Sequence, residues 1–203
     1  GAVTEPIRRE WLLSDLQIGF LSTAFTLLYA GAGIPLGRMA DTRSGKTVLQ
    51  LGLLVWSLLT GLCSFAWNYW SLFLLRIGVG IGEACCAPTA ISIIGKRFPV
   101  TGRSAATSLF MMGLPLGSAL SYSLGGYLSH EYGWRWAFLT AGLAGILLAV
   151  IGRYGIEFAE ERKTTVPQHE REKQRSGFPL LLSILRVPGF FWIILSGALH
   201  NFN

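Results

Sequence analysis

The chain has 203 residues, of which 51% are apolar and only 14% are charged, and its formal net charge is +6. A soluble domain would carry about a quarter charged residues. Here the charges instead cluster between long apolar runs, a pattern typical of helical membrane proteins that cross the bilayer several times. The composition therefore excludes an ordinary soluble domain, and the continuous, non-alternating apolar runs argue against a transmembrane β-barrel.

Five complete membrane spans are predicted in chain order: 16–37, 47–67, 70–94, 104–128 and 135–154. Charged and turn-forming residues separate the spans, and Trp and Tyr mark several ends, where aromatic rings sit at the level of the lipid headgroups. We therefore expect an all-α membrane protein with a transmembrane bundle over 1–154. A cytoplasmic linker over 155–186 and the start of a further span over 187–203 complete the expected organisation.

The basic residues predict the orientation of the spans. Most of the 17 Lys and Arg residues fall in three connecting segments, 37–47, 95–103 and 152–186. Because cytoplasmic loops carry an excess of Lys and Arg, these three segments are predicted to be cytoplasmic. The positive charge is thus explained by membrane orientation, and no nucleic-acid partner is expected.

Arg76 and Glu83 are two charged residues inside the third predicted span. A charge at the centre of a span costs about 2.5–3.5 kcal/mol on insertion scales, so such residues usually face a polar cavity and serve function. Seven residues are nearly two helical turns, which puts both side chains on one face about 10 Å apart. The pair therefore predicts a solute pathway inside a helical bundle.

Each of the two charges has a functional and a structural interpretation. The Arg76 guanidinium could bind a phosphate or carboxylate through two parallel hydrogen bonds, or it could be neutralised by a partner helix. Burial favours the neutral form of Glu83 and a nearby arginine favours the ionised form, which makes Glu83 a candidate proton carrier. The alternative for Glu83 is a permanent contact that only holds helices together.

Further polar residues in the spans are weaker candidates for substrate contact. Tyr29, Ser118 and Tyr122 could line the cavity, although lipid-facing or helix-facing positions are equally open to them. His200 and Asn201 lie about a dozen residues into the last apolar run, where a substrate site or a hydrogen-bonded helix contact would both use them.

The sequence gives no pattern for an enzyme, a metal or a cofactor. Cys63, Cys85 and Cys86 all fall inside apolar runs, where cysteine packs as a small apolar residue. No span holds a nucleophile with a base or a set of metal ligands at a suitable spacing. We therefore expect neither catalysis nor a bound metal or cofactor.

Four motifs resemble those of the major facilitator superfamily, and their amino-acid sequences are most similar to those of its spinster-like branch. The motifs are GRMADTRSGK at 37–46, RIGVGIGEA at 76–84, GLPLGSALSYSLGGYL at 113–128 and GWRWAF at 133–138. The first motif supplies Asp41, Arg43 and Lys46, whereas Thr42 and Gly45 depart from the usual pattern. The order and spacing of the four motifs carry the resemblance over nearly the whole chain.

The resemblance implies a fold and a function. It implies a major facilitator-type bundle aligned over helices 2–6 and the start of helix 7, that is, the N-terminal half without its first helix. It further implies a monomeric secondary transporter that moves an anionic lipid, such as a lysophospholipid or a sphingoid phosphate, by alternating access coupled to protons. Asp41, Arg43 and Lys46 would act as a conformational gate. A small organic anion or sugar-phosphate transporter is the first alternative, and a channel is the second.

Overall fold

The computed structural model describes residues 3–42 and 44–161, without the side chains of 41, 42 and 154–161. Helices form nearly all of this part of the chain, and it contains no strand. In chain order the elements are α1 Thr4–Trp11, α2 Asp15–Thr42, α3 Gly45–Cys63, α4 Tyr69–Glu83, α5 Cys86–Arg97, α6 Val100–Leu120, the π-helical segment η1 Ser121–Gly125, α7 Gly126–Glu131 and α8 Trp134–Glu161. The predicted all-helical architecture is confirmed.

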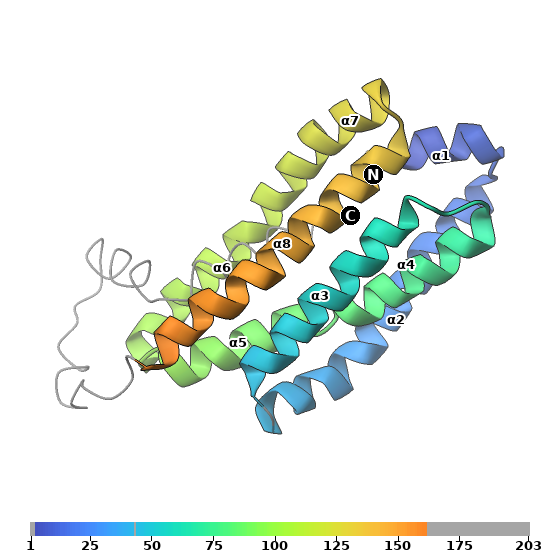
Figure 1. Cartoon of the computed structure of the whole chain (residues 1–203). Coiled ribbons are helices and arrows are strands. Elements are labelled where there is room, and N and C mark those ends of the chain that lie inside the picture. The colour runs from blue at the N-terminus through green and yellow to red at the C-terminus, as the bar shows by residue number, and fades with distance from the viewer. Residues whose placement is uncertain (1–2, 43, 162–203) are drawn as a thin grey trace.

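The long helices run up and down in one bundle (Figure 1). Short connections join them alternately at two ends. One end, called here the α1 end, carries α1 together with the α3–α4 and α7–α8 connections. The opposite end, called the Lys96 end, carries the α2–α3 and α5–α6 connections.

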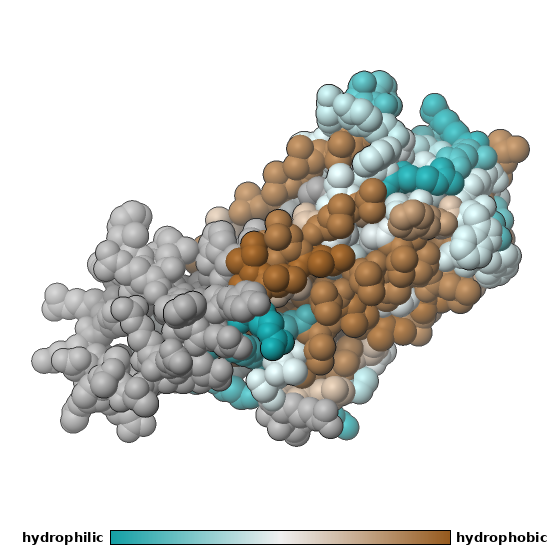
Figure 2. Space-filling view, viewed as in Figure 1, coloured by the Kyte–Doolittle hydropathy of each residue, from teal (hydrophilic) through white to brown (hydrophobic). Residues whose placement is uncertain are grey.

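Four helices in the described part of the chain are long and apolar enough to cross a membrane: Asp15–Ala40, Gly45–Cys63, Tyr69–Arg97 and Trp134–Arg153. They coincide with four of the five predicted spans. The remaining range, 104–128, lies in the helical column α6–η1–α7, whose Ser, Thr, Gly and Pro residues lower its hydropathy. In the view of Figure 2, apolar residues cover the middle of the described surface and polar ones gather toward both ends.

The predicted end of the last span at residue 154 is not a helix end, because α8 continues to Glu161. The expected linker therefore begins as helix. Residues 162–203, which include the rest of that linker and the expected start of a further span, lie outside the described part of the chain.

The third span consists of two helices in sequence, with a break at Ala84 and Cys85. Pro88 explains the position of the break. Its ring nitrogen has no hydrogen to donate, and its ring clashes with the carbonyl four residues back, which here belongs to Ala84. The span predicted over 70–94 is thus present as Tyr69–Arg97, and the structure adds a division directly after Glu83.

Helix α3 lies at the centre of the bundle and meets its neighbours through glycines. A Cβ added at Gly142 of α8 would lie 2.5 Å from the Cα and N of Gly61 in α3. On the other side of α3, a Cβ added at Gly82 would lie 3.1–3.4 Å from Trp56. Small residues allow helix backbones to approach closely in membranes, so these glycines set the spacing of α3 to α8 and to α4.

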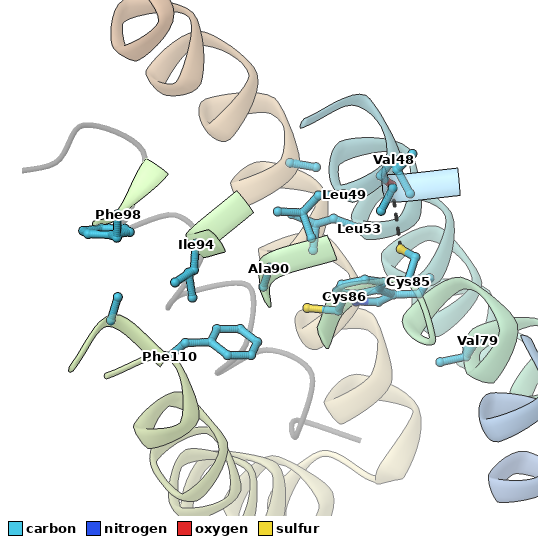
Figure 3. Close-up of a cluster of buried hydrophobic side chains, with 14 residues drawn as sticks. Val48, Leu49, Leu53, Val79, Cys85, Cys86, Ala90, Ile94, Phe98 and Phe110 are labelled. Carbon is cyan, nitrogen blue, oxygen red and sulfur yellow. Dashed lines mark hydrogen bonds between the residues drawn. The ribbon is translucent and has the colours of Figure 1, made fainter. Parts of the chain in front are cut away.

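A core of buried apolar side chains fills the Lys96 half of the bundle (Figure 3). The side chains of Leu49 and Leu53 from α3 lie near Ala90 and Ile94 from α5, and Phe110 reaches in from α6. The Cys85 thiol donates to the carbonyl oxygen of Val48 at 3.7 Å. This core fixes α4 and α5 against α3, and thereby fixes the helix on which both intramembrane charges lie.

Candidate functional site

Arg76 lies in the middle of α4, on the side of that helix that faces α2. Its guanidinium carbon lies 4.9 Å from the centroid of the Phe25 ring, a cation–π arrangement. Its Nη1 atom is buried and has no hydrogen-bond partner among the described residues. A buried donor without a partner is costly in any protein, and an anion that reached this atom would supply the missing acceptor.

A cavity of about 280 Å³ opens beside Arg76. Residues from α1, α2, α4 and α8 line it: Val3, Thr4, Ile7, Leu13, Ile18, Leu21, Ser22, Phe25, Thr26, Leu72, Arg76 and Phe138. Among the described residues of this lining, Arg76 is the one that carries a charge. The cavity therefore combines a single cation with predominantly apolar walls.

The hydroxyl groups in the lining from α2 are turned toward their own helix. Ser22 Oγ donates to the Ile18 carbonyl at 3.2 Å, and Thr26 Oγ1 donates to the Ser22 carbonyl at 2.9 Å. These hydroxyl protons are thus already used in hydrogen bonds. Among the lining groups, the Arg76 guanidinium is left as the strongest donor to a bound solute.

Glu83 is the last residue of α4 and lies next to the break in the span. It is 2% exposed, in contrast to the partly exposed Arg76, and it is not among the residues that line the Arg76 cavity. Tyr29 of α2 lies within electrostatic reach of Glu83, Cys85 and Cys86. The structure thus places the predicted proton carrier Glu83 in a packed environment with Tyr29 near it, and the predicted anion-binding Arg76 at a cavity.

Ser118 and Tyr122 do not line the Arg76 cavity. Ser118 is half-buried in α6, and Tyr122 is exposed in η1. The structure therefore does not bring these two residues together with Arg76, and their contact with a substrate stays a prediction. His200 and Asn201 lie outside the described residues.

The three predicted gate residues belong to the connection between α2 and α3. Asp41 is in the last turn of α2 and Lys46 in the first turn of α3. The Asp41 side chain and all of Arg43 lie outside the described part, so their predicted role stays a prediction. The structure adds Lys96 to this end, because its Nζ donates to the Ala40 carbonyl at 3.5 Å. A cation near a helix C-terminus is favourable. In the sequence, the basic pair Lys96–Arg97 directly after an apolar run was the pattern from which Lys96 could have been predicted at this end.

Sequence reasoning also missed the short helix α1 and the ring of Phe25. The signal for α1 was the spacing of Ile7 and Trp11, which lie four residues apart on one helical face. Ile7 is 5% exposed. Phe25 gave no signal of its own, because one phenylalanine in an apolar span is indistinguishable from any other lipid-facing residue.

Comparisons with known proteins all indicate the same family. Residues 1–202 match the Major Facilitator Superfamily. The chain is 34% identical over 144 residues to a probable L-galactonate transporter of Escherichia coli, covering 71% of this chain and 32% of that protein. It is 31% identical over 145 residues to probable sphingolipid transporter spinster homolog 1 of Arabidopsis thaliana, covering 71% and 30%.

A solved structure is also similar, that of a bacterial homolog of the human lysosomal transporter Spinster in an inward-facing and occupied conformation. The TM-score is 0.58 and the identity 33%, over 74% of this chain and 38% of that one. The chain thus spans about a third of the length of the relatives it matches. The predicted resemblance to the superfamily and its spinster-like branch is confirmed, and because these relatives are transporters, so is the prediction of a non-enzymatic protein.

Proposed function

Because the chain belongs to the major facilitator superfamily and is an integral, multi-pass membrane protein, we propose that it forms part of a secondary active transporter for an amphiphilic anionic lipid. Lysophospholipids and sphingoid phosphates are the proposed substrates. Transport would proceed by alternating access around a site near the bilayer midplane, as in other secondary transporters. The segments 37–47, 95–103 and 152–186 would face the cytoplasm, and the transporter would work as a monomer.

The observation that carries this proposal is the Arg76 guanidinium, whose Nη1 has no hydrogen-bond partner among the described residues, at a cavity whose other described lining residues are uncharged. A guanidinium binds phosphate and carboxylate through paired, charge-assisted hydrogen bonds. At about 280 Å³ the cavity lies just below the range of about 300–1,000 Å³ typical of sites for drug-sized ligands. It therefore suits a headgroup with the first part of an acyl chain.

The cavity walls favour a lipid over a hydrophilic anion. Leu21, Leu72 and Phe138 would contact a hydrocarbon chain, whereas a sugar acid needs several hydrogen-bond donors around its hydroxyl groups. The similarity to a sphingolipid transporter supports this choice. The similarity to an L-galactonate transporter supports the alternative, a small organic anion or sugar phosphate held by the same arginine.

Glu83 is the proposed proton carrier. Acids inside membrane spans commonly serve as proton relays, and Glu83 is buried beside the break between α4 and α5. A change in the angle at this break would alter the surroundings of the carboxyl group. Asp41, Arg43 and Lys46 would control the same motion from the Lys96 end of the bundle.

The test uses full-length protein in liposomes with an imposed pH gradient. A labelled lysophospholipid and a labelled sugar phosphate are compared for wild type, Arg76→Ala, Glu83→Gln and Arg153→Gln. The last variant is the control, because Arg153 is exposed and is not among the residues that line the cavity. Loss of charged hydrogen bonds predicts about a tenfold or larger decrease in lipid transport for Arg76→Ala.

The remaining outcomes divide the alternatives. Transport of the sugar phosphate alone would overturn the lipid substrate but retain the anion site. Full gradient-driven transport by Glu83→Gln would overturn the coupling role. Flux that neither saturates nor responds to the gradient would favour a channel.

A further inference from the structure

The wall of the Arg76 cavity at the α1 end is made by a helix too short to be stable alone. Val3, Thr4 and Ile7 line the cavity from α1 or the residue before it. An isolated helix of eight residues is marginal in water, so contacts with the rest of the bundle must hold α1 in place. Those contacts decide whether the cavity is covered.

A cluster at the start of α8 holds the C-terminal part of α1. The Trp134 indole Nε1 donates to Glu10 Oε2 at 2.6 Å, and Arg135 Nη1 lies 2.8 Å from Glu10 Oε1. The Trp11 and Trp134 rings meet edge to face, with centroids 5.4 Å apart. Glu10 is therefore the one residue of α1 that joins both polar groups of this cluster, and α1 and α8 lie next to each other there (Figure 1).

The ionised state of Glu10 supports this attachment. Partial burial on its own would raise the pKa of Glu10, but hydrogen bonds from Trp134 and Arg135, together with the charge of Arg135, lower it below the ordinary value. The carboxylate thus accepts both donors over the neutral pH range. Its side chain is nevertheless 40% exposed and that of Arg135 is 43% exposed, and exposed ion pairs are easily broken.

The connection between α1 and α2 allows a pivot. Leu12 ends α1 in the left-handed conformation, with φ of 51°, and its side chain is exposed. Arg8 bonds to Asp15 at 2.8 Å across this turn. A movement of α1 about the turn would break the Glu10 cluster first, while the pair of Arg8 and Asp15 could persist.

We propose that α1 is a movable lid on the Arg76 cavity, with Glu10 as the positioning residue that holds it closed against Trp134 and Arg135. The lid gives a bound anion a route through the α1 end of the bundle. A role of this route in transport rests on the function proposed above. The motion of α1 does not rest on that function, because it can be measured without a substrate.

The experiment measures how fast a thiol in the cavity wall reacts with a membrane-impermeant maleimide. Leu72 lines the cavity and is 1% exposed, so Leu72→Cys reports opening at that place. The full protein in membranes carries this substitution alone, with Glu10→Ala, or with Glu5→Ala. Glu5 is the matched control, because it bonds only Arg9 within α1 among its described hydrogen bonds and ion pairs.

We expect Glu10→Ala to raise the labelling rate of the new thiol by up to about fivefold, the effect of losing a partly exposed ion pair, and Glu5→Ala to leave it unchanged. The native Cys86, which is 1% exposed in the core of the Lys96 half, reports global unfolding in the same sample. Faster labelling at both sites equally, or the same rate in Glu10→Ala and the parent, would overturn the lid. Arg135→Gln provides a second variant with the same expected direction if Glu10→Ala fails to fold.

Failure of the lid and failure of the proposed function are distinguishable. A lid that opens in Glu10→Ala, combined with normal lipid transport by Arg76→Ala, would retain the lid and remove the anion site. Loss of lipid transport in Arg76→Ala, combined with an unchanged labelling rate in Glu10→Ala, would retain the anion site and remove the lid.

Discussion

Helices α2 and α3 both pack on α4, but they do so by different means. Helix α3 approaches α4 and α8 through glycines, so that backbone meets backbone or the base of a side chain. Helix α2 approaches α4 through large rings: Phe20 stacks on Phe73 with centroids 5.2 Å apart, and Phe25 lies over Arg76. The α3 side is consequently fixed, whereas the α2 side can change when side chains rotate, and the cavity lies on the α2 side.

The same contrast separates the two intramembrane charges. Glu83 lies at the buried end of α4, where close packing against α3 continues into the core of the Lys96 half. Arg76 lies two turns away, beside rings and a cavity. The two oppositely charged residues of this apolar helix therefore differ in their surroundings, and this difference supports different proposed roles for them.

The largest effect is expected at the contact of α3 with α8. In Gly142→Ala the new methyl group would meet the Gly61 backbone at 2.5 Å, and backbone atoms cannot move aside as a side chain can. We expect a loss of about 1–3 kcal/mol or more in the free energy of unfolding, measured by thermal unfolding in nanodiscs. Gly126→Ala is the control, because nothing lies within 4 Å of its added Cβ. Equal stability of the two variants would contradict the fixed contact.

Loss of the ring on the α2 side should cost less. Phe25→Leu removes the cation–π contact with Arg76, which is worth about 0.5–2 kcal/mol, but leaves the glycine contacts of α3 untouched. The thermal midpoint should fall by less than it does in Gly142→Ala. A larger fall would mean that α2, and not α3, holds the bundle together.

The same kind of substitution at a glycine that meets α2, in place of one that meets α3, gives the sharpest comparison. At Gly80 the added methyl group would lie 3.0 Å from the Phe25 ring and 3.3 Å from the Phe25 carbonyl oxygen. The ring can rotate, and alanine gains about 0.5–1 kcal/mol over glycine inside a helix, so Gly80→Ala should change the unfolding free energy by less than about 1 kcal/mol. A loss as large as that of Gly142→Ala would show that the α2 side is equally fixed.

The smallest effect is expected at the lid, as a function of pH. Because the folded-state pKa of Glu10 is lowered from 4.5, its contribution to stability is fully present above its unfolded pKa and is lost as the pH falls through the folded pKa. The difference in thermal midpoint between wild type and Glu10→Gln should therefore be constant near neutral pH and shrink below 4.5. A difference that grows on acidification would contradict the contacts of Glu10 with Trp134 and Arg135.

Much of the fold could be predicted from the sequence, because span length and charge distribution follow directly from the properties of the bilayer. Four of the predicted spans coincide with apolar helices, and Arg76 and Glu83 lie on one helix as expected. The break after Glu83 was missed, although Pro88 marks it. Sequence periodicity describes a span as one helix, and prolines in membrane helices are often accommodated by a kink alone.

The surroundings of the charges could not be predicted, because they depend on contacts between distant parts of the chain. Nothing near Arg76 in sequence indicates that Phe25 covers its guanidinium or that α1 covers its cavity. The link from Glu10 to Trp134 and Arg135 joins residues more than 120 positions apart. Local pattern identifies which residues are unusual, and tertiary packing decides what they face.

The central claim is that Arg76 binds the anionic headgroup of a lipid, and equilibrium binding tests it most directly. The affinity of full-length protein for a lysophosphatidic acid is compared with that for the uncharged monoacylglycerol of the same chain length, in wild type and Arg76→Gln. We predict that wild type prefers the anion by about tenfold or more, as charged hydrogen bonds imply, and that Arg76→Gln abolishes the preference while affinity for the uncharged lipid is unchanged. An equal preference in both proteins would contradict the claim.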